Sequence, residues 1–252
     1  MIGGKMIKVG ISGICGRMGR RIAAMCMEDP EVEISAGIES ADSDSIGADI
    51  GEVLGTDRTG VMVTSDIDEA CGKVDCIIEF TFPGPTLDHL EAARRAGVAI
   101  VIGTTAMDAG SEEKIRSAAS DIPVVYSPNM SVGVNLLFKM IAEAAKALGA
   151  ISDISIDETH HVHKKDSPSG TAKMMAKIVS DVVGKKVQVE AFREGEVVGN
   201  HGIIFDTPYE TLEIRHDAKT RDVFVAGAIE AVKFVKGKAP GLYNMADVLG
   251  LK

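Results

Sequence analysis

The chain has 252 residues, of which 45% are hydrophobic and 25% charged, and its formal net charge is −10. This length allows one large domain or two small ones, while the absence of any apolar run of about 20 residues excludes a membrane span. The negative charge disfavours nucleic-acid binding, and the four cysteines lack metal or disulfide spacing, so we expect a cytoplasmic protein with small-molecule partners and no metal.

The first half of the sequence alternates short apolar runs with segments of helical spacing. The runs, rich in β-branched residues, occur at positions 7–11, 32–38, 61–63, 76–80, 98–102 and 124–126. Helical spacing between them is seen, for example, in Met18, Ile22 and Met25. Strand–helix alternation of this kind predicts an α/β domain with a parallel, Rossmann-like sheet.

The pattern changes after residue 129. Apolar residues at helical spacing predict a helix over 132–148, and a second helix begins near Thr171. Between them the sequence alternates, with Ile154 and Ile156 on one face of a strand and Asp153, Ser155 and Asp157 on the other. Further strands are expected at 187–192, 202–205, 212–216 and 223–225. We therefore expect a second, α+β domain with a mixed sheet.

A glycine-rich motif follows the first predicted strand. Gly13, Gly16 and Gly19 stand at the junction with the first helix, where the backbone can turn sharply and approach a pyrophosphate. Glu39 ends the next strand, 20 residues after Gly19, and an acidic residue there can accept hydrogen bonds from ribose hydroxyls. The motif predicts dinucleotide binding, with a tight structural turn as the alternative.

A second cluster joins histidines and lysines after a strand in the second half. His160, His161 and His163 precede Lys164, and Ser169, Gly170 and Thr171 open the next helix. Hydroxyl and N–H groups at that helix N-terminus can hold a carboxylate, Lys164 can supply a counter-charge, and a histidine can exchange protons near neutral pH. A transition-metal site and a solvated basic surface are the alternatives.

Polar residues also follow two strands of the predicted parallel sheet. They are Gly103, Thr104 and Thr105 after one strand, and Ser127, Pro128, Asn129 and Met130 after another. Ligands of open parallel sheets bind at the carboxyl ends of the strands, so these loops are expected to outline one crevice.

With these motifs, the sequence resembles the 4-hydroxy-tetrahydrodipicolinate reductase (dihydrodipicolinate reductase) family over nearly its whole length. The most specific motifs are Gly13-x-x-Gly16-Arg17-Met18-Gly19, Gly103-Thr104-Thr105, the segment 127–135, and His160-His161-x-His163-Lys164 followed by Ser169-Gly170-Thr171. The resemblance implies reduction of 4-hydroxy-tetrahydrodipicolinate by NADH or NADPH in diaminopimelate and lysine biosynthesis. It also implies a dinucleotide-binding domain of residues 1–130 and 241–252, a substrate-binding and oligomerisation domain of residues 131–240, and a homotetramer.

The resemblance also implies roles for individual residues. His160 and Lys164 would be catalytic, and the dicarboxylate substrate would be bound by His161, Ser169, Gly170 and Thr171. The nucleotide would be held by Gly13, Ile14, Cys15, Gly16, Arg17, Met18, Glu39, Gly103, Thr104, Thr105, Ser127, Pro128, Asn129 and Met130.

Three positions depart from the family pattern. Ser40 stands where many relatives carry Arg, and Phe82 where some carry a basic residue, which weakens the case for NADPH. The stretch after Val183 is shorter than in typical relatives. Two other functions would use part of the same motifs: another amino-acid or hydroxy-acid dehydrogenase, or a non-catalytic NAD(H)-sensing module.

Overall fold

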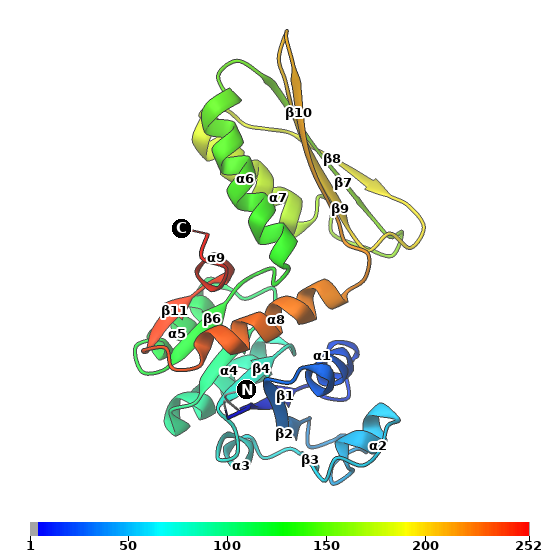
Figure 1. Ribbon diagram of the computed structural model, residues 1–252, viewed down its shortest axis with the longest axis vertical. Helices are drawn as coiled ribbons and strands as arrows, with labels where there is room; N and C mark the ends of the chain where they lie inside the picture. The colour runs from blue at the N-terminus through cyan, green and yellow to red at the C-terminus, as the bar shows by residue number, and fades with distance from the viewer. Residues whose placement is uncertain (1–4, 252) are drawn as a thin grey trace. The chain divides into compact units, whose positions relative to one another are not determined.

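The computed structural model describes residues 5–251 and divides them into two compact units (Figure 1). The first unit contains residues 5–130 and 225–250, and the second contains residues 131–224 and residue 251. No helix within the described residues is long and apolar enough to cross a membrane.

The first unit is built on a seven-stranded sheet whose neighbouring strands are all parallel. In spatial order its strands are β11 (Gly241–Tyr243), β6 (Pro123–Tyr126), β5 (Ala99–Ile102), β4 (Cys76–Glu79), β1 (Ile7–Ser12), β2 (Val32–Ile38) and β3 (Val63–Thr64). All residues of β4 and β5 are buried, as expected for central strands that are covered on both faces. The predicted Rossmann-like sheet is confirmed.

The helices of the first unit follow its strands in sequence. They are α1 (Arg17–Glu28), α2 (Ile50–Leu54), α3 (Ile67–Cys71), α4 (Pro83–Ala96), α5 (Ala109–Ala118), α8 (Asp222–Val235) and α9 (Met245–Val248). Apolar side chains of α3, α4 and α5, including Leu90 and Ile115, pack with those of β4 and β5, including Ile77 and Ile100, in one buried cluster.

The strand predicted at residues 223–225 is wrong, because these residues open helix α8. The apolar run does not alternate, and Val225, Ala228, Ile229 and Val232 are buried at helical spacing. A Cβ on Gly227 would lie 1.7 Å from the carbonyl oxygen of Met130, so a glycine is needed where α8 packs against the end of the first segment. The chain thus returns to the first unit at Val225, earlier than the expected residue 241.

The second unit packs two helices on a mixed four-stranded sheet, as predicted. Helices α6 (Val132–Leu148) and α7 (Gly170–Val183) accompany a sheet in the order β10 (Thr211–Asp217), β9 (Asn200–Asp206), β7 (Asp153–His160) and β8 (Val189–Arg193). Strand β7 is antiparallel to β9 and parallel to β8. The hydrophobic core of the second unit includes Leu137, Ile141, Ile156, Met175 and Phe205.

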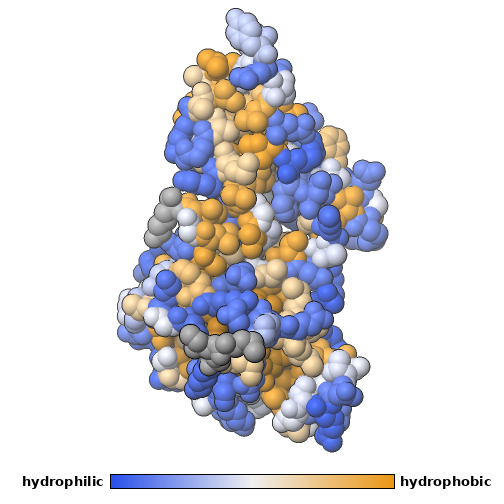
Figure 2. All heavy atoms as spheres, in the orientation of Figure 1, coloured by the Kyte–Doolittle hydropathy of each residue, from blue (hydrophilic) through white to orange (hydrophobic). Residues whose placement is uncertain are grey.

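Helix α6 carries more apolar side chains than this core buries. Val132, Leu136 and Met140 follow one another at intervals of four residues and are between 38% and 44% exposed. Figure 2 shows hydrophobic residues gathered over this part of the surface.

Candidate active site

The predicted catalytic histidine lies at the end of the core strand of the second unit. Side chains alternate along β7, so Glu158 and His160 continue the row that Ile154 and Ile156 begin on the helix-covered face. Glu158 is fully buried and His160 is only 8% exposed. Two ionisable residues are thus placed in the core at the point where α7 begins.

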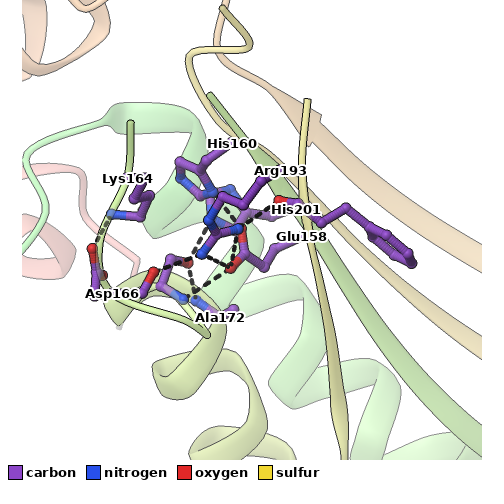
Figure 3. Close-up of polar contacts among 9 residues, drawn as sticks. Glu158, His160, Lys164, Asp166, Ala172, Arg193 and His201 are labelled. Atoms are coloured by element: carbon purple, nitrogen blue, oxygen red, sulfur yellow. Dashed lines mark hydrogen bonds and ion pairs between the residues drawn. The ribbon is translucent and has the colours of Figure 1, made fainter. Parts of the chain in front are cut away.

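Glu158 is surrounded by hydrogen-bond donors (Figure 3). Its Oε2 lies against Nδ1 of His160, and its Oε1 accepts the backbone N–H of Ser169 at 3.0 Å. Both Nη atoms of Arg193, on the neighbouring strand β8, donate to this carboxylate at 3.1–3.2 Å. Burial raises the pKa of Glu158, but these donors outweigh burial and hold the pKa below its ordinary value.

His160 is shaped by burial and by charges on several sides. Burial lowers its pKa, the Glu158 carboxylate raises it, and the positive charges of Lys164 and Arg193 lower it, with a net shift downward. A Cβ on Gly199 would lie 2.9 Å from Nε2 of His160, so that residue leaves room beside the ring nitrogen opposite Glu158.

Lys164 lies on the loop between β7 and α7. Its ammonium pairs with Asp166 at 2.9 Å, and its side chain is 22% exposed. Arg193 donates a hydrogen bond to the backbone carbonyl of Asp166 at 2.6 Å. This contact holds the loop against β8, the strand that pairs with β7 beside His160. Lys164 can therefore bind the carboxylate of a ligand only if its ion pair with Asp166 opens.

Ser169 is the N-cap of α7. Its hydroxyl accepts the N–H of Ala172 at 3.2 Å, and Gly170 and Thr171 form the first turn. The Oγ atom also lies 3.3 Å from Nε2 of His201, a buried β9 residue whose ring packs edge-on to that of His160. Burial lowers the pKa of His201 to about 4, so this ring is neutral near pH 7.

The remaining histidines of the cluster lie on the loop side. The rings of His161 and His163 are tilted to each other at 6.1 Å, and Nδ1 of His161 is buried with no partner among the described residues. The described part of the chain contains no group of three His, Cys, Asp or Glu side chains arranged to hold a metal ion.

The glycine loop of the first unit has the geometry of a phosphate-binding turn. Gly13 has a φ of +69°, and a Cβ on Gly19 would lie 2.0 Å from the Gly13 carbonyl oxygen. Within the described residues no side chain caps α1 at Gly16, and the first turn of that helix has no acidic residue. The glycines thus let the turn pack directly against the start of α1, whose N-terminus no described side chain caps, and this geometry fits a pyrophosphate.

Glu39 and Ile14, two other predicted nucleotide contacts, differ in the groups that they present to a ligand. Glu39 accepts the N–H groups of Cys15 and Ser40, each at 3.0 Å, at the end of β2. The Ile14 side chain is fully buried and its N–H donates to the Ile38 carbonyl, so no side-chain contact with a ligand is available there. A carboxylate fixed at the end of β2 suits the ribose hydroxyls of a nucleotide.

The other predicted loops lie at the same edge of the sheet. Thr104 is buried and accepts hydrogen bonds from Thr81 N–H at 3.2 Å and Thr86 Oγ1 at 2.9 Å, while Thr105 is exposed. Ser127 Oγ donates to the carbonyl of Asn129 at 2.9 Å. Pro128 is exposed and Met130 is buried.

Several residues without a role in the sequence analysis prove central to these sites. They are Glu158, Arg193 and His201 in the second unit, and Glu79 and His89 in the first. The alternation along β7 was a usable signal for Glu158, since it puts this carboxylate on the buried face. Nothing local in the sequence pairs Glu158 with Arg193, 35 residues away.

The structure brings the predicted residues together within each unit: the glycine loop and Glu39 in the first, and His160, Lys164 and Ser169 in the second. A parallel sheet with a phosphate-binding glycine loop, joined to a unit with a buried histidine–carboxylate pair, defines a nucleotide-dependent oxidoreductase.

The chain belongs to the dihydrodipicolinate reductase family. The family profiles described as dihydrodipicolinate reductase, N-terminus and C-terminus, match residues 7–130 and 133–249. The chain is 39% identical to 4-hydroxy-tetrahydrodipicolinate reductase of Methylococcus capsulatus, covering 98% of this chain and 99% of the relative. It is 40% identical to the enzyme of the same name from Syntrophotalea carbinolica, covering 98% and 100%.

A solved structure has the same fold. The dipicolinate-bound dihydrodipicolinate reductase from Paenisporosarcina sp. TG-14 matches with a TM-score of 0.82 at 22% identity, covering 96% of this chain and 98% of that one. The family resemblance seen in the sequence is confirmed.

Proposed function

We propose that this protein reduces 4-hydroxy-tetrahydrodipicolinate to tetrahydrodipicolinate with NADH or NADPH, a step of diaminopimelate and lysine biosynthesis. Family membership over the full length supports this reaction. In the structure, the observation that carries it is the buried Glu158–His160 pair directly beside the N-terminus of α7. That arrangement puts an acid–base group next to an anion-binding helix end.

The first unit holds the nucleotide. The glycine loop and the N-terminus of α1 bind the pyrophosphate, Glu39 binds the ribose, and the loops after β5 and β6 complete the site. When bound, the nicotinamide supplies a hydride to the substrate ring.

The second unit holds the dicarboxylate. The first turn of α7, with Ser169, Gly170 and Thr171, offers N–H and hydroxyl groups to one carboxylate, and His161 lies on the adjoining loop. Lys164 exchanges its partner Asp166 for a substrate carboxylate or donates a proton itself. These contacts orient the ring for reaction.

His160 is the general acid. Reduction of the conjugated ring requires one proton in addition to the hydride, and water leaves from the 4-hydroxy form. The imidazolium gives up the proton on Nε2, the nitrogen that faces away from Glu158, and keeps the electron pair of the N–H bond.

The test is the consumption of NADH and of NADPH with substrate made in place from pyruvate and aspartate semialdehyde. We expect oxidation of at least one cofactor and inhibition by pyridine-2,6-dicarboxylate, a planar mimic of the ring. His160→Gln should mainly lower kcat, whereas Lys164→Ala should affect both kcat and KM. Oxidation of neither cofactor would overturn the proposal, and binding of NADH without turnover would indicate a sensing module instead.

We also propose a cytoplasmic homotetramer. The apolar side chains that α6 leaves exposed support association with a further protein surface, and the four cysteines, all unpaired thiols, fit a reducing compartment. Light scattering of the purified protein would give the mass of the assembly, and a monomeric mass would refute the tetramer.

A further inference from the structure

We infer that Glu158 is a positioning residue that fixes the tautomer of His160, so that the exchangeable proton is carried by Nε2. This inference rests on the proposed function, in which His160 donates a proton. Figure 3 shows the two side chains pointing at each other from the same face of β7. Because an ionised carboxylate only accepts hydrogen bonds, Nδ1 of His160 must carry a hydrogen whenever Glu158 is charged.

The donors around Glu158 keep it charged inside the core. A fully buried carboxyl would ordinarily bind a proton, but Glu158 accepts hydrogen bonds from His160, from the Ser169 N–H and from Arg193, which also contributes a positive charge. Arg193 is also directly opposite His160 in the register of β7 and β8. The contact between Arg193 and Glu158 is therefore positioned by the pairing of β7 with β8 and does not depend on a flexible surface contact.

The fixed tautomer has a direct consequence for proton transfer. In the charged ring both nitrogens carry hydrogens, and loss of the Nε2 proton breaks that N–H bond while its electron pair stays on the ring. The neutral ring that results already has its remaining hydrogen on Nδ1 against Glu158. No rotation or tautomer exchange is then needed between successive turnovers.

Glu158 also links the three parts of the site. It holds His160 through Oε2, the start of α7 through the Ser169 N–H, and the Lys164 loop through Arg193, which binds the Asp166 carbonyl. The two groups proposed to handle protons are thus positioned from a single buried carboxylate.

Several charges other than Glu158 face His160. Lys164 and Arg193 are cations whose fields lower its pKa, while Asp166 neutralises Lys164. His201 on β9 packs edge-on to the ring, and His216 on β10 lies beyond it, with a 6.3 Å separation from His201. Among these groups only Glu158 contacts Nδ1 of His160. Removing Glu158 therefore changes the tautomer of His160, whereas removing one of the other charges changes only the electrostatic field at the ring.

The experiment compares the wild type with Glu158→Gln, which keeps the shape and removes the charge. We expect kcat to fall at least about 10- to 100-fold, the loss typical when a residue that orients a metal-ligating histidine through its second nitrogen is removed, with a much smaller change in the KM of the dicarboxylate. The alkaline limb of the kcat profile should move to lower pH, because the group that raises the pKa of His160 is lost. Glu158→Asp should recover part of the activity.

The tautomer itself is read by ¹⁵N NMR of the histidine side chains in the free protein, with His160 assigned from the spectrum of His160→Gln. We expect the Nδ1–H form in the wild type and a mixture or the Nε2–H form in Glu158→Gln. Asp181→Asn, which removes an exposed carboxylate paired with Lys177 on α7, is the matched control and should change neither readout.

The two proposals fail in distinguishable ways. An Nε2–H tautomer in the wild type, or wild-type kcat and pH profile in a folded Glu158→Gln, overturns the role of Glu158 whatever the substrate. If Glu158→Gln does not fold, Glu158→Asp and the wild-type spectrum still decide the question. A wild-type protein with the Nδ1–H tautomer but no oxidation of NADH or NADPH overturns the proposed function instead.

Discussion

A buried carboxylate organises the nucleotide edge of the first unit, and its removal gives a quantitative prediction. Glu79 ends β4, is fully inaccessible to solvent, and contacts Nδ1 of His89 at 2.6 Å. It also accepts the N–H and hydroxyl of Thr81 and, at 3.3 Å, the hydroxyl of Thr86. Ser12, next to the first glycine of the phosphate loop, lies 3.2 Å from the same His89 nitrogen.

Replacing Glu79 by alanine leaves these groups without their acceptor. Breaking a buried pair by removing one partner costs roughly 3–5 kcal/mol, but Thr104 already accepts from Thr81 and Thr86, so we expect a loss of about 2–4 kcal/mol. For a unit of this size that lowers Tm by roughly 4–16 °C. Because the network joins the loops after β1, β4 and β5, the affinity for NADH should fall as well.

Urea and thermal unfolding followed by circular dichroism would measure the stability, and titration with NADH would measure the binding. Glu79→Gln keeps an acceptor oxygen and should lie between wild type and alanine. Glu69→Ala, which removes an exposed carboxylate paired with Lys73, should leave both quantities unchanged. A Glu79→Ala protein as stable as the wild type would refute the reasoning.

Three further predictions follow from single positions. Ser40→Arg should raise kcat/KM with NADPH relative to NADH by roughly 10- to 100-fold, since a charged hydrogen bond to the 2′-phosphate contributes about 1.5–3 kcal/mol; an unchanged ratio would contradict it. Gly19→Ala should weaken NADH binding by roughly 1–3 kcal/mol in a titration, because its Cβ would lie 2.0 Å from a carbonyl oxygen, whereas a Cβ on Gly84 meets open space and Gly84→Ala is the control. His201 has its pKa lowered to about 4, so the folded state binds fewer protons than the unfolded state and loses about 3 kcal/mol as pH falls from 6.5 to 4. Urea unfolding across that range should show a shallower pH dependence in His201→Gln, and an equal slope would exclude this cause.

Much of the fold follows from local patterns in the chain. The parallel sheet was predictable because buried central strands need nearly continuous apolar runs, as at β4 and β5. The helix predicted over 132–148 matches α6 at both ends, because its apolar spacing is regular. The run at 223–225 was ambiguous, since short stretches of valine suit a buried helix as well as a strand.

The candidate sites, like the fold, were predictable from the sequence only in part. The glycine loop, Glu39 and the histidine cluster were predictable because each function needs particular residue types at close spacing along the chain. The environment of His160 was not predictable, because it depends on which side chains the register of the sheet places opposite one another. Burial alone would neutralise Glu158. The hydrogen bonds from His160, the Ser169 N–H and Arg193, which the fold brings around the carboxylate, hold its pKa below the ordinary value.

The sequence by itself therefore determined the class of fold, the family and the residues that can perform chemistry, because these depend on periodicity and on motifs. The tertiary structure decided the return of the chain at Val225 and the partners of the buried ionisable groups. Those partners come from distant segments, and the free energy of a buried charge depends on them rather than on its neighbours in the chain.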